Sequence, residues 1–235
     1  MEKERLNKYL SAAGVCSRRE ADRMIAEGKV TVDGKPAVLG TMVHPGQNVV
    51  FCGKPVVREE PPVLLAFNKP RGIVCTTDSR REKQNVIDYI QYPVRIYPVG
   101  RLDKDSEGLL LLTNQGEWMD QILRGRNGHE KEYMVTVDKE ITGEFIKKMS
   151  GGVPILDTVT RSCTVEKCGR NRFRIVLTQG LNRQIRRMCE YLGYRVVALK
   201  RVRIMNVKLG SLKTGEYREV TGAEIREMKR LLKKQ

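Results

Sequence analysis

The sequence predicts an α+β protein of two domains, a small N-terminal helix-helix-hairpin domain and a larger domain around one mixed, largely antiparallel sheet. Three observations lead to this class. The length of 235 residues suits one small and one medium domain, each able to bury a core. Paired prolines at Pro61-Pro62, after three charged residues, predict a linker near residues 58–62 that separates domains 1–60 and 63–235. After this linker, the apolar pattern changes from helical spacing to strand-like runs.

The N-terminal domain is predicted to begin with two short helices. The first is expected over residues 5–13, because its apolar residues recur on one helical face and Gly14 follows where a helix would end. Ser17-Arg18-Arg19-Glu20 fits a capping box that opens a second helix, which Gly28 ends. Residues 30–37 alternate like a strand that turns at Asp33-Gly34, and residues 48–51 supply a further strand.

The larger domain is predicted to alternate between strands and helices. Strand-like runs occupy residues 63–68, 109–113, 133–138, 172–178 and 195–204. Helical spacing occupies residues 117–124, 142–149, 182–192 and 223–234. This order predicts one mixed sheet covered by helices.

The composition indicates a globular protein of the cytoplasm. Hydrophobic residues make up 40% and charged residues 31% of the chain, and no apolar run is long enough to cross a bilayer. The mixed charges at the N-terminus lead into no apolar segment, so we expect no secretory signal. The six cysteines are scattered, which favours reduced thiols, and Cys163 and Cys168 lack the second ligand pair of a zinc site. We therefore expect neither a disulfide framework nor a bound metal.

The formal charge of +16 indicates a nucleic-acid partner. Residues 1–62 contribute +2 and residues 63–235 contribute +14, so the excess is not a basic tail. Residues 180–203 are denser still, with seven basic residues and the single acid Glu190. A solvated charged face would not favour one sign. Arg183 and Arg187 in this interval are expected to contact the substrate.

A glycine-bounded turn at residues 97–108 carries the candidate catalytic acids. Asp103, Asp105 and Glu107 lie directly before an apolar strand, where loops on rigid scaffolds often carry function. Residue chemistry does not choose among the three acids, and a turn that only caps and solvates itself explains them equally well.

The N-terminal domain resembles the S4 RNA-binding domain. The likeness runs through Arg5-Leu6-Asn7-Lys8-Tyr9-Leu10, through Ser17-Arg18-Arg19-Glu20-Ala21 and through residues 28–34. It implies that Arg5, Lys8, Ser17, Arg18 and Arg19 bind RNA phosphates, a role that suits their donor groups. Helix capping is the structural alternative for Ser17. Because this domain is nearly neutral, we expect it to position the RNA and not to supply most of the affinity.

The whole chain resembles the RsuA/RluB/RluE/RluF family of ribosomal RNA pseudouridine synthases. The likeness rests on Gly100-Arg101-Leu102-Asp103, on Asn68-Lys69-Pro70-Arg71-Gly72 and on residues 179–188. Residues 129–133, 152–156 and 203–207 are similar to the RluF branch, in which Asn206 replaces a common glycine. The resemblance identifies Asp103 as the catalytic aspartate. It also implies a pseudouridine synthase catalytic domain behind an S4 domain.

The resemblance assigns roles to four further residues. Arg186 would pair with Asp103 and keep it ionised, whereas an i,i+4 pair with Glu190 is its structural alternative. Tyr133 would stack on the target base, or else belong to the sheet core. Leu199 would line an apolar pocket, or again belong to the core. Arg101 would enter the RNA stack vacated by the flipped uridine, with backbone phosphate binding as its alternative.

The predicted reaction converts a specific uridine of large-subunit (23S) ribosomal RNA, flipped out of a stem-loop, to pseudouridine. Detaching uracil and rejoining it through C5 involves no net redox change or hydrolysis, so we expect no cofactor. Transfer RNA is an alternative substrate, because basic surfaces recognise folded RNA shape. A non-catalytic S4-type ribosome assembly protein is the alternative class, against which Asp103, Tyr133 and Arg186 argue together. A carbohydrate hydrolase does not fit so basic a chain. We expect a monomer without membrane contact.

Overall fold

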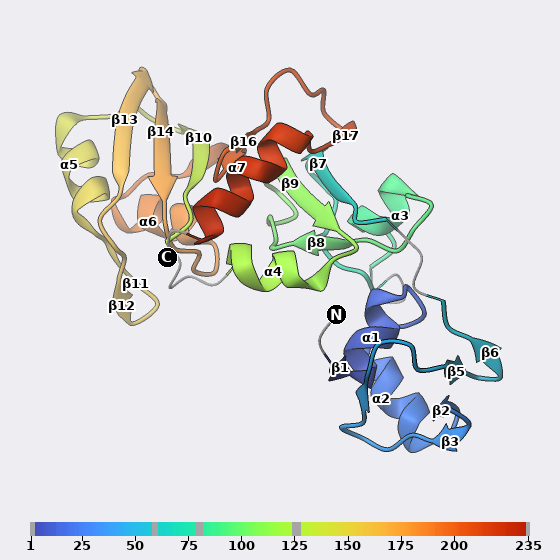
Figure 1. Cartoon of the computed structure of the whole chain (residues 1–235). Helices are drawn as coiled ribbons and strands as arrows, with labels where there is room; N and C mark the ends of the chain where they lie inside the picture. The colour runs from blue at the N-terminus through green and yellow to red at the C-terminus, as the bar shows by residue number, and fades with distance from the viewer. Residues whose placement is uncertain (1–2, 58–60, 79–81, 124–127, 234–235) are drawn as a thin grey trace. The chain divides into compact units, whose positions relative to one another are not determined.

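The computed structural model describes residues 3–57, 61–78, 82–123 and 128–233, which form two compact units (Figure 1). One unit comprises Met1–Pro62 with Pro93–Arg95 and Asn114–Gly116, and the other comprises Val63–Tyr92, Ile96–Thr113 and Glu117–Gln235. The predicted linker near residues 58–62 lies partly outside the described residues. No helix in these described ranges is long and apolar enough to span a membrane.

The N-terminal unit has the predicted helix-helix-hairpin order. Its helices are α1 (Leu6–Ala12) and α2 (Arg18–Ala26), and its strands are β1 (Glu4–Arg5), β2 (Val30–Val32), β3 (Lys35–Pro36), β4 (Met42–Val43), β5 (Val49–Phe51) and β6 (Lys54–Pro55). The first helix begins one residue later than predicted, because Arg5 is extended and pairs with Met42. Ser17 caps α2 as predicted, its hydroxyl accepting a 3.1 Å hydrogen bond from the Glu20 amide.

The core of this unit lies between the two helices and the hairpin strands. Leu6 and Leu10 of α1 and Ile25 of α2 are buried against strand residues such as Val30. The hairpin turns at Asp33-Gly34 as predicted, and both residues have positive φ angles, 49° and 77°. Such a pair of left-handed residues matches the twist of the flanking strands. The sequence pattern thus predicts both helices, the turn and the strands β2, β3 and β5, but not the two-residue strands β1, β4 and β6.

The larger unit is built on one mixed, largely antiparallel sheet, as predicted. In the described part of the chain the strand order is β13-β14-β10-β15-β9-β7-β17, with β16 beside β15 and β8 beside β9. The central pair β9 and β15 is parallel, and the other pairings are antiparallel. The strands are β7 (Leu64–Lys69), β8 (Tyr97–Val99), β9 (Glu107–Thr113), β10 (Lys131–Val137), β13 (Thr164–Gly169), β14 (Arg172–Leu177), β15 (Val196–Ile204), β16 (Val207–Lys208) and β17 (Tyr217–Glu219).

The helices of this unit are α3 (Val86–Ile90), α4 (Gly116–Leu123), α5 (Gly143–Gly151), α6 (Gln184–Tyr191) and α7 (Gly222–Lys233), and a small hairpin is formed by β11 (Pro154–Ile155) and β12 (Thr158–Val159). The four predicted helices correspond to α4, α5, α6 and α7, and the five predicted strands to β7, β9, β10, β14 and β15. The sequence did not predict β13, because this edge strand is mostly exposed and lacks an apolar alternation. Nor did it predict β8, whose middle residue is Pro98.

Two apolar clusters flank the place where the candidate site forms. One packs α5 and α6 against β10, β13, β14 and β15, through residues such as Met149, Met188 and Phe173. The other packs α4 and α7 against β7 and β9, through Ile122, Met228 and Leu111. The loop that enters β9 and the start of α6 meet between these clusters, and they bring the predicted motifs together.

Candidate active site

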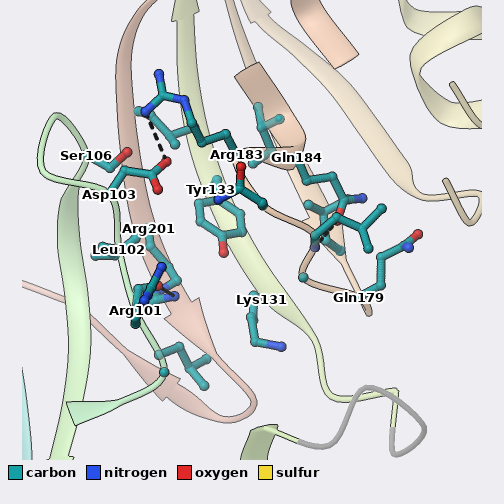
Figure 2. A pocket seen from close by; sticks show the side chains of 18 of the residues that line it. Arg101, Leu102, Asp103, Ser106, Lys131, Tyr133, Gln179, Arg183, Gln184 and Arg201 are labelled. Carbon is teal, nitrogen blue, oxygen red and sulfur yellow. Dashed lines mark hydrogen bonds and ion pairs between the residues drawn. The ribbon is translucent and has the colours of Figure 1, made fainter. Parts of the chain in front are cut away.

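A cavity of about 490 Å³ opens between the two apolar clusters of the larger unit (Figure 2). Its lining comes from the loop before β9, from β10, β14 and β15, and from the N-terminal end of α6. Six of the predicted site residues line it: Arg101, Asp103, Tyr133, Arg183, Arg186 and Leu199. The motifs singled out in the sequence therefore converge on one space.

Among the three candidate acids of the turn, Asp103 is the one that lines the cavity. Asp105 and Glu107 are not part of its lining. The Asp103 carboxylate lies 3.7 Å from the Arg183 guanidinium, so it is close to a cation but still faces the cavity (Figure 2). Geometry thus separates three acids that the local sequence could not distinguish.

The loop that carries Asp103 is held through its backbone carbonyl groups. The Asp103 carbonyl accepts a hydrogen bond from the Ser106 amide, and the Lys104 carbonyl accepts one from the Gly72 amide. The Asp105 carbonyl accepts from Arg71 Nε and Arg186 Nη2, each at 3.1 Å. A carboxylate on such a loop keeps its position without substrate, which favours catalysis.

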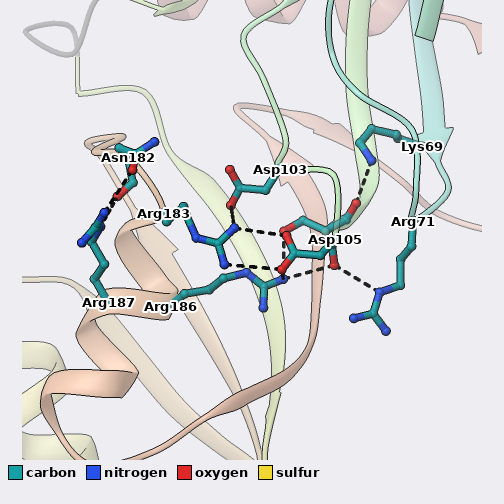
Figure 3. A network of polar contacts seen from close by, with 9 residues as sticks. Lys69, Arg71, Asp103, Asp105, Asn182, Arg183, Arg186 and Arg187 are labelled. Atoms are coloured by element: carbon teal, nitrogen blue, oxygen red, sulfur yellow. Dashed lines mark hydrogen bonds and ion pairs between the residues drawn. The ribbon is translucent and has the colours of Figure 1, made fainter. Parts of the chain in front are cut away.

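Lys69 supports the same loop from within the protein. Its side chain is 0% exposed, and Nζ donates to the carbonyls of Ser106 and Pro70 at 2.9 and 2.8 Å (Figure 3). Burial lowers the pKa of Lys69, although the charges of Asp105 and Asp103 oppose that shift. The Asn68-Lys69-Pro70-Arg71-Gly72 motif thus supports the loop that carries Asp103.

The predicted ion pair between Asp103 and Arg186 is wrong. In the described structure Arg186 pairs instead with Asp105, with 3.3 Å between Nη2 and Oδ2, and Nη2 also donates to the Ser106 hydroxyl at 3.2 Å (Figure 3). Arg183 is the cation near Asp103, and it also lies 3.4 Å from Asp105. The i,i+4 pair with Glu190 does not occur among the described ion pairs either.

The start of α6 explains this exchange of partners. The predicted helix began at residue 182, but Arg183 adopts a left-handed conformation with φ 50°, so the helix begins at Gln184. Residues three apart at a helix start share a face, so Arg183 and Arg186 both reach the acidic turn. Arg183 reaches toward Asp103, and Arg186, one turn later, reaches the backbone and carboxylate of Asp105.

The two arginines keep Asp105 ionised. Burial by itself would raise the pKa of Asp105, but the charges of Arg186 and Arg183 outweigh it and lower the pKa. Burial lowers the pKa of Arg186, and Asp105 partly offsets this effect. Asp105 is therefore a structural counter-ion for the cationic start of α6, which leaves Asp103 as the carboxylate that faces the cavity.

Tyr133 and Leu199 face the cavity from adjacent strands. Tyr133 on β10 is half-buried, and its hydroxyl makes no hydrogen bond within the described ranges. Leu199 on β15 is buried and also belongs to the apolar cluster under α6. Both the pocket role and the core role predicted for Leu199 are therefore compatible with its position.

Arg101 and Arg187 lie differently. Arg101 is exposed and lines the cavity, while its carbonyl accepts a hydrogen bond from Arg201. Arg187 is not part of the lining, and its guanidinium binds the carbonyl of Asn182 at 3.1 Å. Arg101 is thus accessible from the cavity, as its predicted contact with the substrate requires, whereas Arg187 binds the turn before α6.

Lys131, Arg201 and Gln184 also line the cavity, although the sequence did not predict them as site residues. Lys131 could have been found, because it stands two residues before Tyr133 and a strand places such residues on one face. Gln184 is buried, and its side chain accepts a hydrogen bond from the Leu181 amide. No local sequence pattern identifies Arg201, because its place at the cavity depends on the pairing of β15 with β10.

The predicted phosphate-binding residues of the N-terminal unit lie on or near its surface. Arg5, Ser17, Arg18 and Arg19 are exposed. Lys8 is half-buried and pairs with Glu4 at 3.6 Å. Ser17 caps α2, as its structural alternative required. Arg18 and Arg19 open α2, where the helix dipole and free amides favour anions.

Family models match both units. The model for RNA pseudouridylate synthase matches residues 63–191, and the S4 domain model matches residues 4–49. The first match covers the loop of Asp103, Tyr133 and the start of α6. The second covers α1, α2 and the first hairpin.

Curated relatives and one solved structure agree with these models. The dual-specificity RNA pseudouridine synthase RluF of Escherichia coli strain K12 is 53% identical over 97% of this chain and 79% of that protein. The ribosomal large subunit pseudouridine synthase B of Bacillus subtilis strain 168 is 35% identical over 97% of this chain and 96% of that protein. A crystal structure of pseudouridylate synthase, 27% identical, covers 95% of this chain and 99% of its own, with a TM-score of 0.71. The protein belongs to the RNA pseudouridine synthases, a family of isomerases, and carries an S4 domain before its catalytic domain.

Proposed function

We propose that the protein converts a specific uridine of large-subunit (23S) ribosomal RNA to pseudouridine, with Asp103 as the catalytic carboxylate. The observation that carries this assignment is the position of Asp103, which lines the cavity while Asp105 and Glu107 do not. The braced loop supports the role, because it presents the carboxylate at a fixed place. The relative from Bacillus subtilis is named for the large ribosomal subunit, which supports this RNA as substrate.

The other cavity residues receive roles from their positions. The ring of Tyr133 offers a flat surface for stacking on the flipped uracil, and its free hydroxyl is available to the base. Leu199 and Leu177 supply apolar walls that exclude water from the detached base. Arg101, exposed at the cavity, is suited to fill the stack that the uridine leaves. Arg183 keeps a cation beside Asp103.

The test uses RNA labelled with tritium at uracil C5, because rejoining uracil through C5 releases that hydrogen. Wild-type protein should release tritium, and Asp103→Asn should release none. Glu107→Gln is the matched control, because it makes the same change four residues away, outside the cavity lining, and should retain activity. Full activity of Asp103→Asn would overturn the assignment.

We infer a second substrate, a uridine of transfer RNA. The relative that is 53% identical is named a dual-specificity enzyme, which favours two RNA substrates. Recognition of folded RNA shape by an S4 domain and a basic surface is compatible with both. Pseudouridines mapped in ribosomal and transfer RNA, with and without the gene, would identify the targets. A strain in which transfer RNA is unchanged would restrict the activity to ribosomal RNA.

A further inference from the structure

Two cations line the cavity without any acidic partner from the protein. Lys131 is half-buried, and its ammonium group makes no hydrogen bond or ion pair within the described ranges. Arg201 is 3% exposed and donates only to the backbone carbonyls of Leu109, at 2.7 Å, and Arg101, at 3.4 Å. Its Nη2 atom is buried and finds no hydrogen-bond partner in the described part of the protein.

The sheet places both cations beside Tyr133. Lys131 and Tyr133 are two residues apart on β10 and therefore share a face, and Arg201 is the partner of Tyr133 on β15. The register shifts between Glu132 and Tyr133, so that Arg201 and Ile204 both face the cavity despite their odd spacing. Figure 2 shows Lys131, Tyr133 and Arg201 around the same space.

The opposite face of the same strands is charged but balanced. Glu132 pairs there with Arg203 at 2.7 Å and with Arg174 at 2.8 Å. On the cavity side, burial lowers the pKa of Lys131 and the charge of Arg201 lowers it further, and no acid offsets these effects. A fold does not gain stability from unpaired, partly buried cations. Such a pair is expected where a ligand supplies the missing negative charge.

We propose that Lys131 and Arg201 form an anion subsite for the uracil that is detached during the reaction. This inference rests on the proposed function. When the bond between C1′ and N1 breaks, its electron pair leaves with the base, and the negative charge spreads over N1 and the two carbonyl oxygens. The same cleavage leaves C1′ electron-deficient beside the Asp103 carboxylate. When C5 donates an electron pair to C1′, the new bond cancels the negative charge of the base. The base then loses the proton on C5 and gains one on N1, which leaves its charge unchanged. Lys131 and Arg201 stabilise the anion between these steps without exchanging atoms with it.

The depth of the subsite favours uracil over an RNA phosphate. Arg201 is almost fully buried, so a phosphate of the RNA backbone does not reach it without entering the cavity. Arg101 and Arg183 are exposed at the same cavity and suit backbone phosphates better. The subsite lies beside Tyr133, the residue assigned to the base.

The experiment compares Lys131→Met with Lys200→Met. Lys200 lies on β15 between Leu199 and Arg201, faces the other side of the sheet and is not part of the lining. Lys131→Met should lower kcat for tritium release by about 10²-fold, the effect of losing one preorganised donor. RNA affinity and its salt dependence should stay at wild-type values, and the thermal midpoint should stay the same or rise. Lys200→Met should keep the wild-type kcat. Lys131→Arg should restore part of the rate and extend activity to higher pH, because arginine stays charged there.

Each result has one meaning. A wild-type kcat for Lys131→Met, with active wild-type protein, would overturn the subsite and leave the proposed function intact. If Lys131→Met keeps its kcat while its RNA affinity falls and the salt dependence of binding decreases by about 0.9, Lys131 contacts an RNA phosphate. That result would also overturn the subsite. A lower thermal midpoint for Lys131→Met would contradict the claim that its charge is uncompensated. Wild-type protein that releases no tritium would refute the proposed function itself.

Discussion

Replacement of Arg186 by methionine is expected to lower both stability and activity, because Arg186 holds the loop that carries Asp103, the proposed catalytic carboxylate. Its side chain is 11% exposed. It donates to the Asp105 carbonyl and the Ser106 hydroxyl and pairs with the Asp105 carboxylate. Methionine fills a similar volume but offers no donor. The change therefore removes three polar contacts from the loop that positions Asp103.

The expected loss of stability is about 2 kcal/mol. A hydrogen bond from a charged donor contributes roughly 1.5–3 kcal/mol, and Arg186 makes two to neutral acceptors. The ion pair adds less than about 1 kcal/mol, because the Asp105 side chain is 43% exposed. Removal of the charge also relieves a burial cost of about 2–3 kcal/mol, consistent with the lowered pKa of Arg186, which leaves a net loss of about 2 kcal/mol. At roughly 2–4 °C per kcal/mol for a domain of this size, the thermal midpoint should fall by about 4–8 °C.

Arg183→Met is the comparison that tests the assignment of partners. The Arg183 side chain is 43% exposed, and its contacts with Asp103 and Asp105 are longer, 3.7 and 3.4 Å. Its loss should cost less than about 1 kcal/mol of stability while lowering kcat, since it removes the cation beside Asp103. Thermal unfolding and tritium release would be measured for both variants. A larger stability loss for Arg183→Met than for Arg186→Met would refute the loop-holding role of Arg186.

Three further predictions follow from the structure. Gly108→Ala should lower the free energy of unfolding by at least about 2 kcal/mol, because the φ of Gly108 is +103° and a Cβ would lie 2.3 Å from the Arg201 carbonyl oxygen. Gly143→Ala, with open space around it, is the control and should be neutral or stabilising in denaturant titrations. Asp105→Asn should lower the stability of the protein at pH 7. Because folding lowers the pKa of Asp105, the stability advantage of the wild type should be complete above the ordinary pKa of 3.8 and disappear as the pH falls through the pKa of the folded state. An advantage that persists below both pKa values would contradict a lowered pKa of Asp105. Replacement of Arg18 and Arg19 by methionine should weaken RNA binding without changing kcat at saturating RNA. The slope of the logarithm of the binding constant against the logarithm of the salt concentration should fall by up to about 2. An unchanged slope would show that these residues do not contact RNA phosphates.

The fold could be predicted from the sequence wherever one face of an element is apolar. The helix α2 and the strand β10 satisfy this condition, since each buries one face. The edge strand β13 fails it, because its pairing with β14 places mostly polar side chains in solvent. The five-residue helix α3 is too short to show a period. The pattern thus predicts elements through their burial, and elements with little burial leave no pattern.

The site could be predicted as a set of motifs but not as a set of contacts. Asp103, Tyr133 and Leu199 all reach the cavity, as the resemblance implied. The partner of Arg186 could not be predicted, because it depends on a left-handed Arg183 that starts the helix two residues late. The spacing of Arg183 and Arg186 places both side chains on one helix face. Which of the two neighbouring acids each arginine meets depends on the residue at which the helix begins.

The charges around the cavity explain why the acid and the unpaired cations belong to one site. Asp103 approaches from the braced loop before β9, and its cation Arg183 stands at the start of α6. Lys131 and Arg201 approach from the sheet, where the chain supplies them with no acid. A carboxylate next to the sugar favours cleavage of a bond whose electrons leave with the base, and unpaired cations near the base favour the resulting anion. The separation of the acid from the cations across the cavity therefore matches the charge separation that breaking the glycosidic bond requires in the proposed reaction, in which Tyr133 stacks on the base.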